Sequence, residues 1–299
     1  MTDTICVLAL DAADYELLQK WGCNNILLER HSKLKTFSWS KDEPYTPEVW
    51  ATVATGVSPK AHGIGASKQV MDWNNPLLRF ASRFTEKLPN TVRQELGRPF
   101  REYGFESEFN QIEDGVSHPF DAQLSWPGLG KARHLRRMWR LMDDTVRGSM
   151  PQPLVDERMK GLTGQELGFL VAMNNTQKGV VGAHAHVLDI AGHLFAEDTE
   201  TLREWYEWVD AQVGWLRSHC NKLVILSDHG IQNASSNDED LGSHSWRAFI
   251  SSQGINAELP DSVYDVREYL EGHAETYDAE PTKATMDTPT ETLEDLGYL

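Results

Sequence analysis

Three short apolar runs constrain what this chain can fold into more than any other feature. They span residues 4–10, 180–188 and 223–226, and β-branched side chains recur in them. Such runs are typical of strands buried on both faces of a sheet, and all three are too short to cross a membrane. Amphipathic stretches lie between them, the longest over residues 197–220. This alternation predicts an α/β fold with a mostly parallel central sheet and helices on both faces.

Each of the three runs leads into an aspartate. Because the carboxyl ends of parallel strands meet at one edge of a sheet, where ligands bind in open α/β folds, we expect these carboxylates to lie together. Histidines accompany them along the chain. The candidate residues of these two kinds are Asp11, Asp189, His193, Asp228, His229 and His244. Taken singly, each has an ordinary structural explanation, such as a helix cap or a hydrogen-bonded core histidine.

Taken together, three carboxylates and three imidazoles form a ligand set that suits Zn²⁺ and also accepts Mn²⁺. Six ligands are more than one tetrahedral ion takes from a protein. The set therefore predicts two divalent ions, Zn²⁺ in preference to Mn²⁺, with open positions for a nucleophile and for substrate oxygens. No residue in it identifies a substrate-binding group.

A further candidate is Thr46, which stands before Pro47 at the start of an apolar-periodic stretch that ends at Thr55-Gly56. This pattern predicts a helix with Thr46 as its N-cap and Pro47 as its first residue. A hydroxyl at that position lies beside unpaired backbone N–H groups, in the positive end of the helix dipole, which favours an anion there. Thr46 is therefore either a simple cap or a catalytic hydroxyl, and this stretch alone leaves both possibilities open.

The composition of the region between the predicted strands indicates that the chain has two parts. Residues 67–175 are irregular and rich in Trp, Arg, Pro and Gly, with helical stretches near 77–87, 131–147 and 155–162. We interpret them as an inserted, largely helical region that covers the site and lies outside the main sheet. The core is then formed by residues 1–66 and 176–299, with further strands expected at 34–40 and 248–251 and a last helix at 262–272.

The net charge of −17 argues against a surface that wraps nucleic acid, because a phosphate backbone would be repelled. Ten of these negative charges lie in an acidic tail, residues 256–299, and arginine outnumbers lysine, which together suggest a high-salt, halophilic cytoplasm. No basic leader and no membrane-length run is present, so we expect a soluble, cytoplasmic protein without a membrane partner. The three cysteines have no metal-type spacing and are expected to be reduced.

The order and spacing of these motifs resemble the alkaline phosphatase superfamily, and most closely its type I phosphodiesterase and nucleotide pyrophosphatase branch. The matching motifs are Asp11, Thr46-Pro-Glu-Val-Trp50, Thr55-Gly-Val-Ser-Pro-Lys-Ala-His-Gly-Ile64, Asp189-Ile-Ala-Gly-His193, Asp228-His-Gly230 and Gly242-Ser-His244. The resemblance covers residues 4–65 and 180–252, and it implies an alkaline phosphatase-like core. His186 departs from it, since many relatives carry an aromatic residue there. No Cys-x-Pro-x-Arg motif is present, so a sulfatase mechanism is not supported.

By analogy with that family, one ion is expected at Asp189, His193 and His244. The other is expected at Asp11, Asp228 and His229, together with Thr46. The resemblance implies a hydrolase of phosphodiester or nucleotide pyrophosphate bonds in a small phosphorylated substrate, acting through a phosphothreonine at Thr46. Hydrolysis of phosphomonoesters or phosphonates on the same fold is the alternative, and an inactive metal-binding module is a more distant one.

Overall fold

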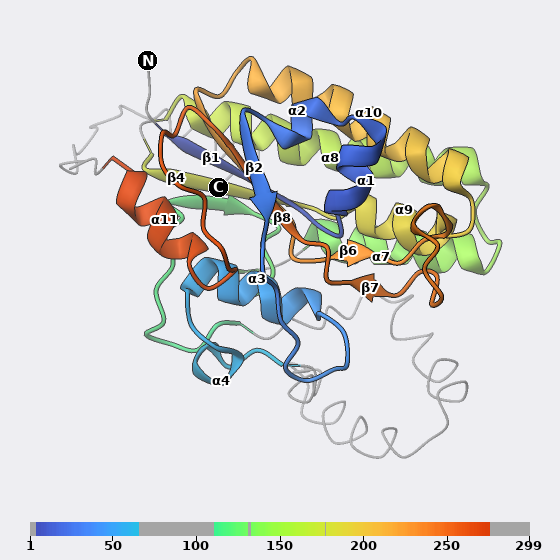
Figure 1. Ribbon diagram of the computed structural model, residues 1–299, viewed down its shortest axis with the longest axis horizontal. Helices are drawn as coiled ribbons and strands as arrows, with labels where there is room; N and C mark the ends of the chain where they lie inside the picture. The colour runs from blue at the N-terminus through green and yellow to red at the C-terminus, as the bar shows by residue number, and fades with distance from the viewer. Residues whose placement is uncertain (1–3, 66–110, 131–132, 177, 276–299) are drawn as a thin grey trace, which may run out of the picture.

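The computed structural model describes residues 4–65, 111–130, 133–176 and 178–275. Its centre is a six-stranded sheet with the strand order β2-β8-β5-β1-β4-β3 (Figure 1). The strands are β1 (Ile5–Leu10), β2 (Arg30–Lys33), β3 (Ala122–Leu124), β4 (Val180–Ala185), β5 (Lys222–Leu226) and β8 (Phe249–Gln253). β1 pairs in parallel with β4 and β5, β3 is parallel to β4, and β8 runs antiparallel to β5 and β2. The predicted mostly parallel α/β fold is confirmed.

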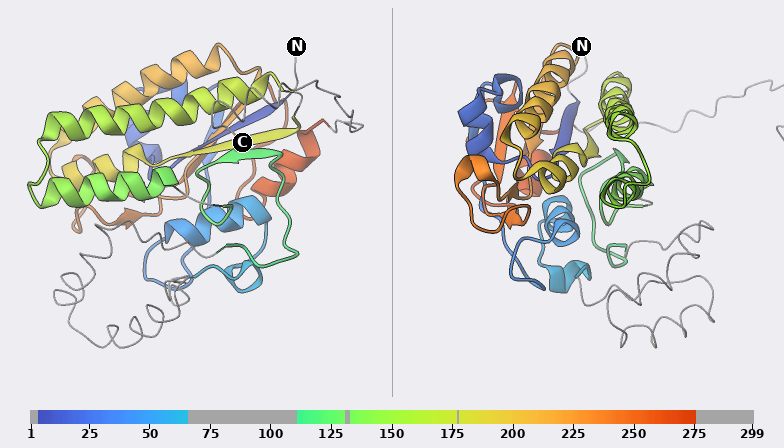
Figure 2. Two further views of the ribbon diagram at one scale, coloured as in Figure 1. Left: turned by 180° about the vertical axis from the view of Figure 1, so that it is seen from behind. Right: turned by 90° about the vertical axis from the view of Figure 1, so that its right-hand side faces the viewer.

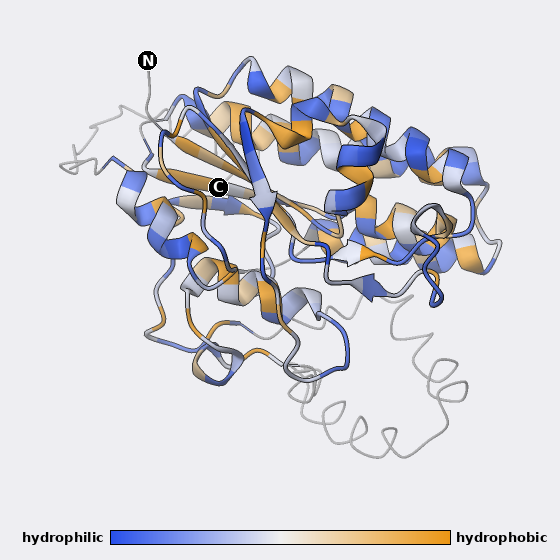
Figure 3. Cartoon of the chain, in the orientation of Figure 1, coloured by the Kyte–Doolittle hydropathy of each residue, from blue (hydrophilic) through white to orange (hydrophobic). Residues whose placement is uncertain are grey.

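Alternate residues of the central strand β1 pack into different helical layers. Cys6, Leu8 and Leu10 belong to one apolar cluster, whereas Ile5, Val7 and Ala9 belong to the other, and all six are fully buried. A strand covered on both faces requires apolar residues at every position, which explains the unbroken run in the sequence. In Figure 3 the strand is accordingly coloured as hydrophobic, while the outer faces of the long helices carry hydrophilic residues.

Two layers of helices cover the sheet, and Figures 1 and 2 show α10 and α3 on opposite sides of it. The first apolar cluster joins the sheet to α1 (Tyr15–Trp21), α2 (Asn24–Leu27), α7 (Arg133–Val146), α8 (Gln152–Asn174), α9 (Val187–Phe195) and α10 (Thr199–Arg217). The second joins it to α3 (Thr46–Thr55) and α11 (Val266–His273), and α4 (Pro59–His62) follows α3. No helix in these described ranges has the length and apolar character needed to cross a bilayer.

Two expectations about strands are wrong. The strand expected at 34–40 is β2 at Arg30–Lys33, and beyond it Lys35 forms only an isolated bridge with Ser262. β2 pairs with β8 at the edge of the sheet and its residues are half-buried or exposed, so it lacks the apolar alternation that marks a strand. The predicted strand over 180–188 ends at Ala185, because α9 begins at Val187.

The middle of the chain contributes to the main sheet, contrary to expectation. β3 extends the sheet beyond β4, and α8, at 23 residues, packs its buried face on the same layer as the core helices. The helix expected near 131–147 is α7, and the one expected near 155–162 is part of α8, whereas 77–87 lies outside the described residues. Covering of the site by residues 67–175 remains a prediction.

Candidate active site

Three adjacent strands deliver the three aspartates to one edge of the sheet. Asp11 follows the last residue of β1, and Asp228 lies two residues beyond the end of β5. Asp189 comes from the first turn of α9, which follows β4. Because β5, β1 and β4 are parallel neighbours, their carboxyl ends lie side by side, and all three carboxylates are buried. The structure therefore brings the three predicted carboxylates together at one edge of the sheet.

The predicted ligands form two groups of three whose ligand atoms lie within 4.8 Å of one another. In the first, Asp189 Oδ1 lies 3.3 Å from His193 Nε2 and 3.6 Å from His244 Nε2. In the second, His229 Nε2 lies 3.4 Å from Asp11 Oδ1 and 3.3 Å from Asp228 Oδ2. The rings of His229 and His244 stack with centroids 3.8 Å apart, so the two groups are adjacent.

One oxygen of each carboxylate has no hydrogen-bond partner among the described residues. These buried atoms are Asp11 Oδ1, Asp189 Oδ1 and Asp228 Oδ2. Leaving a buried charged oxygen unsatisfied costs free energy, so such atoms are rare unless a cation binds them. Each of the three is also an oxygen that faces an imidazole Nε2. The residues present thus fit a pair of divalent ions.

Two histidines carry their proton on the nitrogen that points away from the carboxylates. His229 Nδ1 lies 2.9 Å from the carbonyl oxygen of Gly230, and His244 Nδ1 lies 2.7 Å from that of Pro44. A carbonyl oxygen only accepts hydrogen bonds, so Nδ1 donates in both rings and Nε2 faces the carboxylates. Burial lowers the pKa of His229 to about 3, so this ring is neutral and its Nε2 holds a lone pair. Imidazoles oriented in this way are typical metal ligands.

The three carboxylates are too close to be ionised together without positive charge nearby. Burial and the charges of Asp11 and Asp189 raise the pKa of Asp228 well above its ordinary value. Burial opposes ionisation of the other two as well, but imidazoles outweigh it: His186 lowers the pKa of Asp11, and His193 lowers that of Asp189. Asp189 in turn raises the pKa of His193 to about 9. Cations at this site would relieve the same repulsion.

Thr46 is the first residue of α3 rather than its N-cap, so that expectation was wrong by one position. Tyr45 is the cap, and its carbonyl oxygen accepts hydrogen bonds from the N–H groups of Glu48 and Val49. The Thr46 hydroxyl is therefore not used for capping. Its Oγ1 lies 3.0 Å from His229 Nε2, to which it donates its hydrogen because that nitrogen holds a lone pair.

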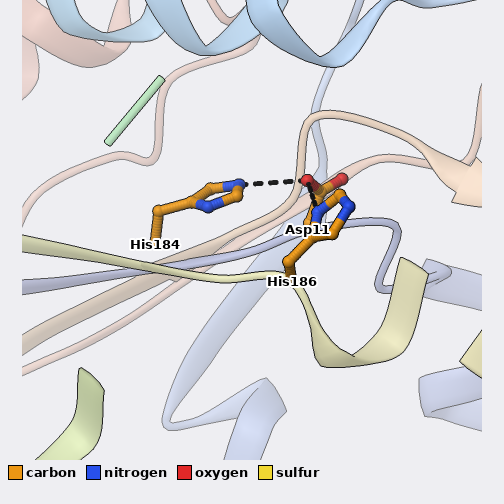
Figure 4. A group of neighbouring side chains, drawn as sticks. All are labelled: Asp11, His184 and His186. Carbon is orange, nitrogen blue, oxygen red and sulfur yellow. Dashed lines mark hydrogen bonds and ion pairs between the residues drawn. The ribbon is translucent and has the colours of Figure 1, made fainter. Parts of the chain in front are cut away.

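The sequence interpretation missed two further histidines. His184 Nε2 lies 3.0 Å and His186 Nδ1 2.5 Å from the same oxygen, Asp11 Oδ2 (Figure 4). The sequence signal for these two histidines is their spacing of two positions at the end of β4.

The sequence model of the family described as type I phosphodiesterase / nucleotide pyrophosphatase matches residues 6–289, nearly the whole chain. The chain belongs to this family. Membership supports the hydrolysis of phosphoric esters, as the resemblance in the motifs implied. No curated protein sequence matches this type I phosphodiesterase family member.

Solved structures with similar folds share little sequence with this member of the family. The alkaline phosphatase from the Antarctic bacterium TAB5 is 12% identical, with a TM-score of 0.45 over 91% of this chain and 98% of that one. Murine ectonucleotide pyrophosphatase / phosphodiesterase 5 is 13% identical, with a TM-score of 0.39 over 77% of this chain and 57% of that one. The phosphodiesterase family member thus spans little more than half of the murine chain.

Proposed function

We propose that this protein hydrolyses phosphodiester or nucleotide pyrophosphate bonds of small phosphorylated substrates, with Thr46 as the nucleophile and two divalent ions, Zn²⁺ in preference to Mn²⁺. The observation that carries the proposal is the placement of the Thr46 hydroxyl. It is buried, it is not used by its own helix, and it lies 3.0 Å from His229 Nε2, close to buried carboxylate oxygens that have no hydrogen-bond partner in the described ranges.

Residues Asp189, His193 and His244 would hold one ion, and Asp11, Asp228 and His229 the other. When bound, such ions lower the pKa of a coordinated hydroxyl and offset negative charge on the attacking and departing oxygens. Thr46 Oγ1 releases its proton to solvent and forms a bond to phosphorus, while the bond to the leaving oxygen breaks and that oxygen takes up a proton from solvent. A water molecule then loses a proton to solvent and attacks the phosphorus of phosphorylated Thr46, and the threonine oxygen leaves and regains a proton.

The start of α3 offers one backbone N–H to a non-bridging oxygen of the substrate. Pro47 has no N–H, and those of Glu48 and Val49 donate to the Tyr45 carbonyl. The N–H of Thr46 itself finds no acceptor among the described residues. It would stabilise the charge that develops on phosphorus-bound oxygen, with the helix dipole aligned in the same sense.

The charge of the described site favours diesters over monoesters. A phosphomonoester carries one more negative charge, for which a site needs an additional cationic group. Arg247, three positions after His244, already forms ion pairs with Asp14 at 2.5 Å and with Asp238 at 2.6 Å. It is therefore not available to a second phosphate oxygen.

A comparison of rates with an aryl phosphate diester, an aryl phosphate monoester and an aryl sulfate tests the proposal. Each substrate is measured with Zn²⁺ and with Mn²⁺, at low and at high salt. We expect the diester to be hydrolysed fastest, the sulfate hardly at all, and every rate to be lost on chelation. Faster hydrolysis of the monoester would replace the proposed activity with that of a phosphomonoesterase, and hydrolysis of none would refute it.

A further inference from the structure

The two oxygens of Asp11 face different surroundings. Oδ1 faces His229 Nε2 at 3.4 Å and has no hydrogen-bond partner in the described part of the chain. Oδ2 is contacted by two imidazoles, His184 Nε2 at 3.0 Å and His186 Nδ1 at 2.5 Å (Figure 4). All three side chains are at most 2% exposed. Two histidines and a carboxylate can hold a metal ion, or the imidazoles can donate two hydrogen bonds to the carboxylate, and the positions of their protons decide between these roles.

Trp139 fixes the proton of His186. The indole N–H of Trp139 lies 2.8 Å from His186 Nε2, and an indole only donates, so Nε2 presents its lone pair. The other ring nitrogen, Nδ1, lies 2.5 Å from Asp11 Oδ2, so the proton of the ring lies on Nδ1 and points at Asp11. The lone pair on Nε2 faces Asp189 Oδ2 at 3.0 Å, a repulsion that an ion at Asp189 offsets.

The surroundings of His184 place its proton on Nε2. The ring is fully buried and packs edge-on against Trp50, with centroids 5.3 Å apart. Its Nδ1 has no hydrogen-bond partner among the described residues. With the proton on Nδ1, the ring would bury an unsatisfied N–H and turn a lone pair toward a carboxylate. With the proton on Nε2, the ring donates to Asp11 Oδ2 at 3.0 Å, its one hydrogen bond to the described part of the chain.

Charge balance points the same way. The four positive charges of two divalent ions already exceed, by one, the three negative charges of Asp11, Asp189 and Asp228. Neutral imidazoles would add no negative charge to balance a third ion, and neighbouring like charges repel strongly in a buried site.

We infer that His184 and His186 are positioning residues that hold Asp11 by two N–H···O hydrogen bonds to Oδ2, in place of a third metal ion. The inference rests on the proposed two-ion function. The paired hydrogen bonds fix the carboxylate plane and leave Oδ1 directed at His229, where the ion is to bind. Replacing a residue that hydrogen-bonds a metal ligand typically changes metal affinity or activity by about 10–100-fold.

Matched pairs of variants separate the hydrogen bond from packing. His184→Gln and His186→Asn each keep an amide N–H where the imidazole donates, whereas His184→Met and His186→Leu keep similar volume without a donor. Zinc content per chain is measured by elemental analysis, and zinc affinity of the metal-depleted protein by competition with a chromophoric chelator. Turnover of an aryl phosphodiester gives kcat and KM.

We expect two zinc ions per chain in the wild type. The Met and Leu variants should bind one of them about 10–100-fold more weakly, with kcat rather than KM affected at limiting zinc, and the Gln and Asn variants should recover most of the loss. Equal affinities within each pair would overturn the inference. So would three zinc ions in the wild type with one lost in His184→Gln, because the histidines would then be ligands.

A measurement on the wild type covers the case in which a donor-less variant fails to fold. In zinc-loaded protein with ¹⁵N-labelled histidine, NMR couplings between ring nitrogens and protons identify the protonated nitrogen of each ring. We expect Nε2–H at His184 and Nδ1–H at His186, and the opposite tautomer of either would refute the inference. Zinc affinity is measured without turnover, so a wild type that hydrolyses no ester but shows the expected affinities would refute only the proposed function.

Discussion

Replacing Asp228 by asparagine should stabilise the metal-free protein and weaken its response to zinc. Asp228 is fully buried, its Oδ2 has no hydrogen-bond partner among the described residues, and its pKa is raised well above the ordinary value by burial and by Asp11 and Asp189. In Asp228→Asn, Oδ1 can still accept from the N–H groups of His229 and Ala12, at 3.1 and 3.4 Å. The new amide nitrogen takes the place of Oδ2, 3.3 Å from His229 Nε2, and can share the lone pair of that nitrogen with the Thr46 hydroxyl.

The size of the effect follows from these contacts. An unsatisfied buried polar group costs about 1–3 kcal/mol, and more when it is charged, so the free energy of unfolding of the metal-free variant should rise by at least about 1–3 kcal/mol. For a chain of this size that raises Tm by on the order of 5 °C. Zinc at about 100 times its Kd adds about 2.7 kcal/mol per site, and the variant should lose roughly that gain at one site.

Calorimetry of chelator-treated and zinc-loaded protein measures both effects. Asp198→Asn is the matched control, since Asp198 is an exposed N-cap of α10 that accepts from the Thr201 N–H, a role that asparagine fills equally well. The control should leave both Tm values nearly unchanged. A Tm of metal-free Asp228→Asn below that of the wild type, or a gain in Tm from zinc equal to that of the wild type, would refute this explanation.

Three other outcomes are expected. Asp189 raises the pKa of His193 to about 9, so the stability that this ion pair adds to the folded protein is fully present below pH 6.5 and is lost as the pH rises through 9. The Tm of the metal-free wild type should therefore fall over that range, and more steeply than the Tm of His193→Gln. In Gly230→Ala the added Cβ would clash with Asp14 Oδ2 and lie 2.6 Å from Ser245 Oγ, so zinc affinity and stability should both fall, whereas Gly164→Ala on open helix surface should stabilise by up to about 1 kcal/mol. If the acidic charge is an adaptation to salt, Tm should rise between low and molar salt, and an unchanged Tm would count against that hypothesis.

The parts of the fold and site that the sequence predicted depend on local patterns. A strand buried on both faces must be apolar throughout, so β1 and β5 were visible, and with them Asp11 and Asp228 at their ends. β2 and the three-residue β3 are half-buried and carry no such pattern. Their place in the sheet depends on long-range pairing.

The site features that the sequence did not predict depend on contacts between distant residues. Ala9 pairs with His184, a register that the sequence does not reveal, and this register brings His184 to Asp11. Trp139 reaches His186 from α7, 47 positions earlier. The cap assignment for Thr46 failed because the Tyr45 carbonyl, a backbone group present in any sequence, satisfies the helix start.

The role of Thr46 is tested most directly by trapping the covalent intermediate. Protein mixed with an aryl phosphodiester is quenched in acid and digested, and the phosphorylated residue is located by mass spectrometry, alongside turnover and zinc content of variants. We expect an adduct on Thr46, no turnover in Thr46→Ala with two zinc ions retained, and near-normal turnover in Thr55→Ala, whose hydroxyl donates to the Ala51 carbonyl within the same helix. Full activity in Thr46→Ala would contradict it.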